Sequence, residues 1–342
     1  MTDQTHMYRE IREIPEATRR LLSEGREAIE IAADDLRRAE PHFISTVARG
    51  SSDHAATYFK YASELTLGLP VASIGPSISS IYGADLKLAH SACIGISQSG
   101  QSPDIVKMTQ SAAKQGALTV AITNEPTSPL AQACKHTIPI HAGTERSVAA
   151  TKTFVTSVVA GLALLAFWKQ DKALIAAIDE LPDHLENAVA HDWPALRVAL
   201  KNRDSLFVLG RGPSYAMSNE AALKFKETCQ IHAESYSSAE VLHGPVSIVE
   251  PGYPVLALAS RDASESSIVS VADKLAQQGA LAFATSDLVK HAEPLGFTKT
   301  SHPLTDPLTL IVSFYAFIEK LARERGINPD LPRNLKKVTE TV

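Results

Sequence analysis

The segment Ser97-Gln-Ser-Gly-Gln-Ser-Pro-Asp104 combines small hydroxyl and amide side chains with a glycine. It follows Cys93-Ile-Gly-Ile-Ser97, an apolar run typical of a buried strand. Gly100 permits a tight turn, and Ser102 and Pro103 suit the N-cap and first position of a helix. Free backbone N–H groups at that helix start could bind a phosphate. The same residues are common in capped surface turns, so the loop alone leaves both interpretations open.

A second small polar turn, Arg49-Gly-Ser-Ser52, follows the apolar run at residues 43–48. Ser51 and Ser52 offer two more hydroxyls at the end of a predicted strand. The carboxyl ends of parallel strands lie at one edge of a sheet. Two such loops at one edge favour a phosphate site over two unrelated turns.

Three charged residues, Glu220, Lys224 and Glu227, recur at i, i+4 and i+7 and share one face of a predicted helix. Phe225 and Cys229 belong to the neighbouring apolar stripe. From the spacing alone, the charged residues indicate a solvated helix face stabilised by modest i,i+4 pairs.

Two further segments carry side chains capable of chemistry. His243 lies in Val241-Leu-His-Gly-Pro245, where a histidine is often only a turn residue. After Gly326 the chain continues as Ile327-Asn-Pro-Asp-Leu-Pro-Arg-Asn-Leu-Lys-Lys337, an ordered-looking tail with two prolines. Without context, such a tail is typical of a frayed basic end.

Short apolar runs alternate with helical stretches along the chain, which predicts an α/β fold with parallel sheets covered on both faces. Five strands per half indicate a flavodoxin-like arrangement in each. Helices are expected, for example, at 104–115 and 218–230. The expected strands are at 43–48, 71–74, 93–97, 118–123 and 136–140, then at 205–209, 232–236, 254–259, 280–285 and 298–302.

The two halves are copies of one unit. Arg49 aligns with Arg211 in Leu206-Phe-Val-Leu-Gly-Arg-Gly-Pro-Ser214, an offset of 162 positions (211 minus 49). So long a period indicates duplicated domains rather than stacked repeats. Prolines at 182 and 194 predict a linker around residues 179–194. The expected organisation is a pair of polar N-terminal helices (1–40), a first domain (41–180), a second domain (195–325) and a C-terminal tail (326–342).

Composition narrows the class of protein. The formal net charge of −5 argues against a nucleic-acid-binding surface. Three separated cysteines fit a reducing compartment, and the N-terminus lacks a secretory pattern, so we expect a cytoplasmic protein. The most apolar run, residues 153–168, is shorter than the roughly 20 residues of a membrane span. Gly210-Arg-Gly-Pro-Ser-Tyr215 lacks the third glycine of a dinucleotide fingerprint, and the histidines lack metal-ligand spacing. We therefore expect neither cofactor nor metal.

The combination of segments resembles the SIS (sugar isomerase) domain family, particularly the isomerase half of glucosamine-6-phosphate synthases. The likeness extends over about residues 25–342. The matching segments are Ile96-Ser-Gln-Ser-Gly100, Glu145-Arg-Ser-Val-Ala-Ala-Thr-Lys152, Ala222-Leu-Lys-Phe-Lys-Glu227, His232-Ala-Glu234, Glu240-Val-Leu-His-Gly-Pro245 and Pro332-Arg-Asn-Leu-Lys-Lys337.

This resemblance implies a role for each matched residue. Glu227 would move a proton between C1 and C2 of a sugar phosphate, with Lys224 stabilising the enediol charge. His243 would open the sugar ring from the neighbouring subunit, which implies a homodimer with a shared active site. Lys337 would attack the open-chain carbonyl as an amine. The residues implied in gripping the phosphate and sugar hydroxyls are Ser51, Ser52, Ser97, Gln98, Ser99, Ser102 and the loop at Val148.

The synthases also carry an N-terminal glutaminase domain that begins with a catalytic cysteine. Residue 2 here is threonine, and Arg49 lies too near the start for such a domain to precede it. We therefore expect deamination of glucosamine 6-phosphate to fructose 6-phosphate and ammonia. An aminotransferase with a separate ammonia source, a fructosamine-6-phosphate deglycase and a non-catalytic sugar-phosphate sensor remain alternatives. The gluco or galacto identity of the substrate, an allosteric effector and assembly beyond a dimer stay open.

Overall fold

The computed structural model describes residues 4–335 and Lys337. The first three residues of the expected N-terminal segment, and residues 336 and 338–342 of the expected tail, lie outside the described part. The chain divides into two compact units. The first-sheet unit comprises Glu13–Glu145, Lys152–Pro182 and the part of the tail that bears Lys337; the second-sheet unit comprises the chain up to Arg12, Arg146–Thr151 and Asp183–Leu335.

The first-sheet unit is built on a parallel sheet with the strand order β2-β1-β3-β4-β5. Its strands are β1 (Phe43–Val47), β2 (Val71–Ser73), β3 (Ser91–Ile96), β4 (Leu118–Thr123) and β5 (His136–Pro139). Val47 pairs with Gly95 in β3, and Ile96 pairs with Ile122 in β4. The loops that follow these central strands therefore leave the sheet at one edge.

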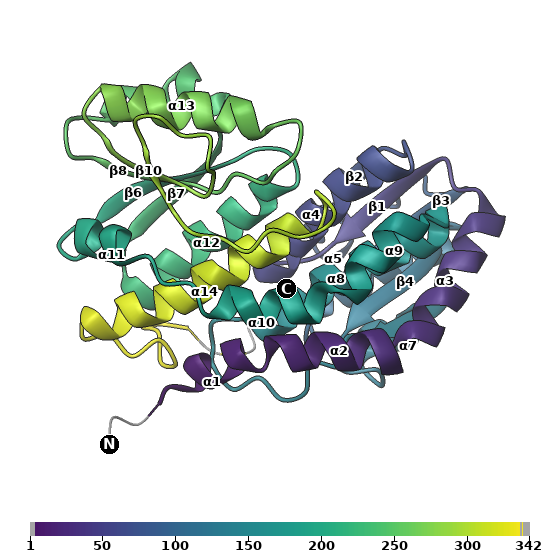
Figure 1. Ribbon diagram of the computed structural model, residues 1–342. Coiled ribbons are helices and arrows are strands. Elements are labelled where there is room, and N and C mark those ends of the chain that lie inside the picture. Colours follow the sequence, from purple (N-terminus) through teal and green to yellow (C-terminus); the bar gives the residue numbers. More distant parts are fainter. Residues whose placement is uncertain (1–3, 336, 338–342) are drawn as a thin grey trace. The chain divides into compact units, whose positions relative to one another are not determined.

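Helices cover both faces of this sheet. The helices of the unit are α2 (Ile14–Glu24), α3 (Arg26–Ala39), α4 (Ser51–Thr66), α5 (Ser77–Ser80), α6 (Pro103–Lys114), α7 (Pro129–Ala133), α8 (Lys152–Lys169) and α9 (Lys172–Asp179). Helix α8 packs against α2, α3, α4 and β4 (Figure 1). It is long and apolar enough to cross a membrane, but 89% of it is buried. A helix that is apolar on all sides and buried in this way is a core helix.

The other face of the first sheet is covered by α6, which packs against β1, β3 and β4. Its contact layer contains Val47, Cys93, Ile105 and Met108, all of them buried. Side chains on one face recur every second residue in a strand and about every 3.6 residues in a helix. The apolar residues follow these repeats, so that the apolar face of α6 packs on the apolar face of the sheet.

The second-sheet unit repeats the first topology. Its strands are β6 (Ser205–Gly210), β7 (His232–Ser237), β8 (Pro254–Ala257), β9 (Leu281–Ala284) and β10 (Glu293–Pro294). They pair in parallel in the order β7-β6-β8-β9-β10, which corresponds to β2-β1-β3-β4-β5. Arg49 follows β1 as Arg211 follows β6. The predicted α/β fold with two five-stranded parallel sheets is confirmed.

Helices also pack on both faces of the second sheet. The helices of this unit are α1 (His6–Arg12), α10 (Leu181–Val189), α11 (Pro194–Leu200), α12 (Ser214–Cys229), α13 (Glu265–Gln277) and α14 (Asp306–Glu324), with the short 3-10 turns η1 (Glu240–His243) and η2 (Pro245–Ile248). Helix α12 packs against β6, β7 and α14, whereas α13 packs against β8 and β9 (Figure 1). Buried Phe207, Val255, Ile268 and Leu275 fill the layer beneath α13.

Three local features differ from what the sequence led us to expect. The tenth strand lies at Glu293–Pro294, not at 298–302, because side chains occupy the backbone groups of Thr300: Asp306 accepts its N–H at 3.0 Å and Arg261 donates to its carbonyl at 2.6 Å. The two units divide between Pro182 and Asp183, inside the expected linker at 179–194, but this stretch is largely helical. Its prolines occupy first turns of α10 and α11, where a proline costs no hydrogen bond. The N-terminal segment forms three helices rather than two.

Candidate active site

The serine loop, residues 97–102, leaves the carboxyl end of β3 and turns at Gly100, whose φ is +61°. The hydroxyl of Ser97 accepts the N–H of Gly100 at 3.2 Å, and the hydroxyl of Ser99 accepts the N–H of Gln101 at 3.3 Å. Ser97 is buried, whereas Gln98 and Ser99 are partly exposed. Hydrogen bonds within the loop therefore fix its conformation, while the partly exposed Gln98 and Ser99 remain accessible to solvent.

Gly100 is required by space as well as by its backbone angle. A Cβ atom at this position would lie 2.1 Å from the hydroxyl oxygen of Ser128. The same Ser128 hydroxyl caps α7 by accepting the N–H of Ala131. The carbonyl of Gly100 also accepts the N–H of Leu130 at 3.1 Å. These contacts hold the loop against α7.

Two helix N-termini meet at this edge. Ser102 is the N-cap of α6 and Pro103 its first residue, as predicted, but the Ser102 side chain makes no capping hydrogen bond. Helix α4 begins at Ser51 after Gly50, which has a φ of +55°. Arg49 joins the two turns by donating to buried Asp104 from Nε at 3.1 Å and Nη2 at 3.0 Å. Adjacent strands and this ion pair place the Ser51–Ser52 turn beside the serine loop.

The face of α12 predicted to be solvated is buried, so that prediction was wrong. The side chains of Glu220 and Lys224 are fully buried, and that of Glu227 is 17% exposed. Lys224 Nζ lies 3.0 Å from Glu220 Oε1 and 2.6 Å from Glu227 Oε2. The hydroxyl of Tyr315 on α14 donates to Glu220 at 3.1 Å. Because α14 packs on α12, the charged residues Glu220, Lys224 and Glu227 form an interior network and not a solvated surface.

The charges in this network stabilise one another. Burial by itself lowers the pKa of Lys224, but the carboxylates of Glu220 and Glu227 outweigh burial and raise that pKa above its ordinary value. Lys224 is therefore a permanent cation. Glu227, the partly exposed member, is held against this cation with part of its side chain accessible.

A second lysine–carboxylate pair lies in the first-sheet unit. Lys337 Nζ donates to Glu145 Oε2 at 2.8 Å. The Glu145 side chain is fully buried, and Thr153 also donates to it through its N–H at 3.1 Å and its hydroxyl at 2.6 Å. The sequence named Lys337 but gave Glu145 no role, although Glu145 opens one of the matched segments.

The remaining predicted residues lie in the second-sheet unit. His243 ends η1, is exposed, and precedes Gly244, whose φ is +143°. Among the described residues, His243 makes no hydrogen bond or ion pair with Glu227 or Lys224. Val148 is partly buried in the 146–151 segment, which is anchored because Glu10 on α1 accepts the N–H groups of Arg146 and Ser147. Glu10 carried no recognisable signal in the sequence.

Comparison with known proteins identifies a family. The model of the SIS domain matches residues 39–167 and 199–289. The glutamine–fructose-6-phosphate aminotransferase (isomerizing) of Symbiobacterium thermophilum is 30% identical over 362 residues, which cover 97% of this chain and 58% of that protein. The chain thus spans a little over half the length of this curated relative.

Solved structures share the fold. A protein of Silicibacter pomeroyi DSS-3, named as a candidate phosphosugar isomerase, is 60% identical with a TM-score of 0.94, covering 96% of this chain and 100% of its own. The glucosamine-6-phosphate deaminase of Thermotoga maritima is 19% identical with a TM-score of 0.73, covering 93% of this chain and 100% of its own. At that identity, the second likeness concerns the fold alone.

Proposed function

Because the chain belongs to the SIS domain family, we propose that it converts glucosamine 6-phosphate to fructose 6-phosphate and ammonia. The reaction moves a proton from C2 to C1 of the open-chain sugar, which gives a C2 imine. Water then hydrolyses that imine, so that C2 becomes the ketone of fructose 6-phosphate and the nitrogen leaves as ammonia. The observation that carries this proposal is the Glu220–Lys224–Glu227 network, because it pairs a buried cation with an accessible carboxylate.

Glu227 is the acid and base of the C1–C2 proton transfer. A carboxylate suits this role because it can remove the C2 proton and return it at C1. Negative charge develops on the sugar oxygen in the enediol-like intermediate, and the Lys224 cation stabilises that charge. Because Glu220 and Glu227 already hold the cation in place, it needs no reorganisation during the reaction.

The serine loop binds the phosphate. This proposal is supported by the position of three hydroxyl groups. Those of Ser51, Ser52 and Ser102 lie at the starts of α4 and α6, where free backbone N–H groups can bind an anion. Gln98 and Ser99 add further donors. Binding at the phosphate orients the distant C1–C2 end and so contributes to the rate of a small-molecule reaction.

Lys337 forms an imine with C2 and displaces ammonia, and His243 of a second subunit assists ring opening. An exposed histidine on η1, flanked by exposed Leu242 and Ile248, suits a surface that a second copy of the chain covers. We therefore propose a cytoplasmic homodimer with two shared active sites and a catalytic tail at residues 326–342, without a metal or cofactor.

The three cysteines are poor candidates for catalysing glutamine hydrolysis. Glutamine hydrolysis of the kind expected for the synthases requires a reactive thiolate. Burial raises the pKa of Cys93 to about 11 and the pKa values of Cys134 and Cys229 to about 12. Thiols in this state are inert. These three thiols are therefore unsuited to that step.

The test is a product assay on the purified chain. With glucosamine 6-phosphate alone, we expect equal amounts of fructose 6-phosphate and ammonia, and none from glucosamine lacking the phosphate. Galactosamine 6-phosphate and a fructosamine 6-phosphate serve as competing substrates. Binding of hexose 6-phosphates without turnover of any of them would reject the enzyme and favour a sensor.

An aminotransferase is the second candidate, because a relative 30% identical over nearly the whole chain carries that name. In this case the chain would accept ammonia from a separate glutaminase. Addition of glutamine and cell extract would then produce glucosamine 6-phosphate from fructose 6-phosphate, whereas the chain alone would release no ammonia.

A further inference from the structure

Among the described residues of the tail, residues 327–335 and Lys337 lie outside helix and strand. What holds the Lys337 amine is the 2.8 Å contact with Glu145. Glu145, in turn, is immobilised by the N–H and hydroxyl of Thr153 in the first turn of α8. Lys337 therefore contacts a buried carboxylate that lies in the loop before α8 and is held by Thr153 of that core helix.

The chemistry of Lys337 depends on the proton that its amine carries. Lysine side chains are ordinarily ammonium ions at neutral pH, and glutamate side chains are ordinarily carboxylates. An ammonium nitrogen has no lone pair and cannot attack a carbonyl, so Lys337 must lose a proton before it can act.

We propose that Glu145 is the proton carrier for imine formation at Lys337; this inference rests on the proposed function of the site. Glu145 takes a proton from the Lys337 ammonium, and the freed lone pair forms a bond to C2 of open-chain fructose 6-phosphate. The carbonyl electrons move to oxygen, which takes the second nitrogen proton and gives a carbinolamine. Protonated Glu145 then donates its proton to the carbinolamine hydroxyl, which leaves as water.

These steps balance without another reactant. Ammonium and carbonyl become a protonated imine and water, and Glu145 ends as the carboxylate it was at the start. The reverse sequence hydrolyses the imine and releases fructose 6-phosphate. The 2.8 Å distance lies within the range of direct proton transfer.

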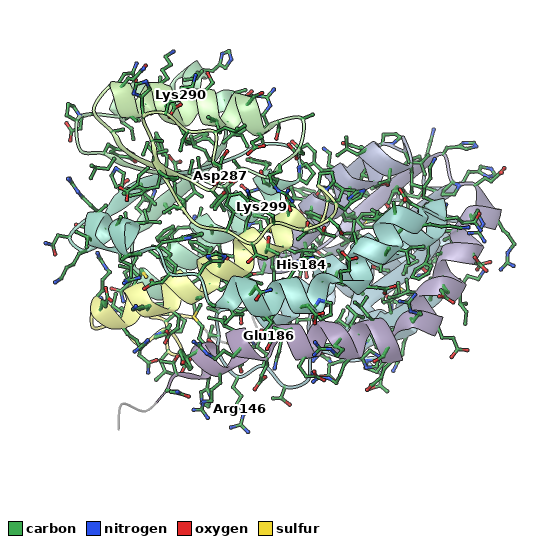
Figure 2. All side chains as sticks on the ribbon, in the orientation of Figure 1. Arg146, His184, Glu186, Asp287, Lys290 and Lys299 are labelled. Atoms are coloured by element: carbon green, nitrogen blue, oxygen red, sulfur yellow. The ribbon has the colours of Figure 1, made fainter. Side chains whose placement is uncertain are left out.

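Glu145→Gln separates proton transfer from positioning. The amide keeps the size of the side chain and an oxygen that accepts a hydrogen bond, but it cannot carry the proton. Glu145→Asp keeps a titratable carboxyl group. Asp287→Asn is the matched control, because Asp287 and Lys299 form an exposed lysine–carboxylate pair at 2.6 Å elsewhere on the chain (Figure 2). Lys337→Met provides the baseline without a nucleophile.

The experiment is reductive trapping of the imine on the full chain. Each variant is incubated with fructose 6-phosphate and cyanoborohydride, and the sugar adduct on Lys337 is quantified by peptide mass spectrometry. Binding of glucitol 6-phosphate, which has no carbonyl, is measured in parallel by calorimetry. Thermal unfolding of each variant verifies that it is folded.

We expect trapping by Glu145→Gln to be slower than wild type by about 100-fold, the lower range for general acid–base catalysis. Binding of glucitol 6-phosphate should stay within about threefold, Asp287→Asn should trap normally, and Glu145→Asp should recover part of the rate. Normal trapping by Glu145→Gln would overturn the inference, as would equal losses in Glu145→Gln and Glu145→Asp. The absence of a Lys337 adduct in wild type would instead overturn the proposed role of Lys337.

Discussion

The ammonium nitrogen of Lys224 lies 2.6 Å from a carboxylate oxygen of Glu227, and it is the lysine, not the glutamate, that is fully buried. A permanent interior cation thus holds a partly exposed carboxylate in one orientation. This arrangement would fix the geometry of the group that we propose transfers the proton before any substrate binds, which general acid–base catalysis requires.

The first prediction concerns the stability of this network. Lys224→Met leaves Glu220 buried without its cation, and breaking a buried pair in this way costs about 3–5 kcal/mol of unfolding free energy. Lys299→Met removes the exposed partner of Asp287 and should cost less than about 1 kcal/mol. Urea denaturation measures both. Equal losses would contradict the burial of the network.

The second prediction concerns the serine loop. Gly100→Ala combines a positive φ with a Cβ that would clash with Ser128, so the loop must shift. We expect KM for the sugar phosphate to rise by about tenfold or more, because distorted binding groups lose about 1.4 kcal/mol or more of binding energy. Steady-state kinetics measure the change.

Gly83→Ala is the matched control for Gly100→Ala. Gly83 has a φ of +62°, but a Cβ atom there would meet nothing within 4 Å. The control therefore carries the backbone penalty of about 1–2 kcal/mol without the clash. Its KM should match wild type. A Gly100→Ala protein with normal KM would remove the loop from the binding site.

The third prediction follows from the Cys93 thiol. Its pKa is about 11 in the folded protein and ordinarily 9.0, so the folded state holds the proton more tightly. Its contribution to stability is fully present below pH 9.0 and is lost as the pH rises toward about 11. The loss amounts to about 3 kcal/mol at most.

Cys93→Ala separates this contribution from other titrations. The unfolding free energy of wild type should fall more steeply than that of the variant between pH 9 and 11, as measured by urea denaturation at each pH. Parallel curves would contradict the shift. In the native protein, a thiol reagent at pH 8 should label the buried cysteines slowly, and unfolding should expose all three thiols.

The fourth prediction concerns the shared active site. If His243 acts in the site of a second subunit, His243→Ala and Glu227→Gln proteins are each inactive alone. After mixing and reassociation, one site in each mixed dimer combines an intact Glu227 with an intact His243. Random pairing then restores about a quarter of wild-type activity. Activity that stays at background in verified mixed dimers would assign His243 to its own subunit.

Much of the fold was predictable because it depends on local patterns. Short apolar runs that alternate with helical stretches, together with the repeated Arg-Gly turns, predicted two similar parallel sheets. Gly100, Ser102 and Pro103 predicted the loop-to-helix turn, because each has a backbone preference that acts within a few residues.

The parts that were not predictable depend on distant contacts. The burial of Lys224 requires α14, whose Tyr315 is 95 positions from Glu220. Glu145 and Lys337 are 192 positions apart, so nothing in the spacing of either segment links them. The false strand at 298–302 has the same cause, since Arg261 and Asp306 use backbone groups that a strand would need.

The most direct test of the central claim follows solvent deuterium into C1 of fructose 6-phosphate by NMR. If Glu227 carries the proton between C1 and C2, the wild-type chain should introduce deuterium at C1. Glu227→Gln should do so slower by about 100-fold or more while still binding the sugar phosphate. Deuterium incorporation at the wild-type rate in Glu227→Gln would contradict the account.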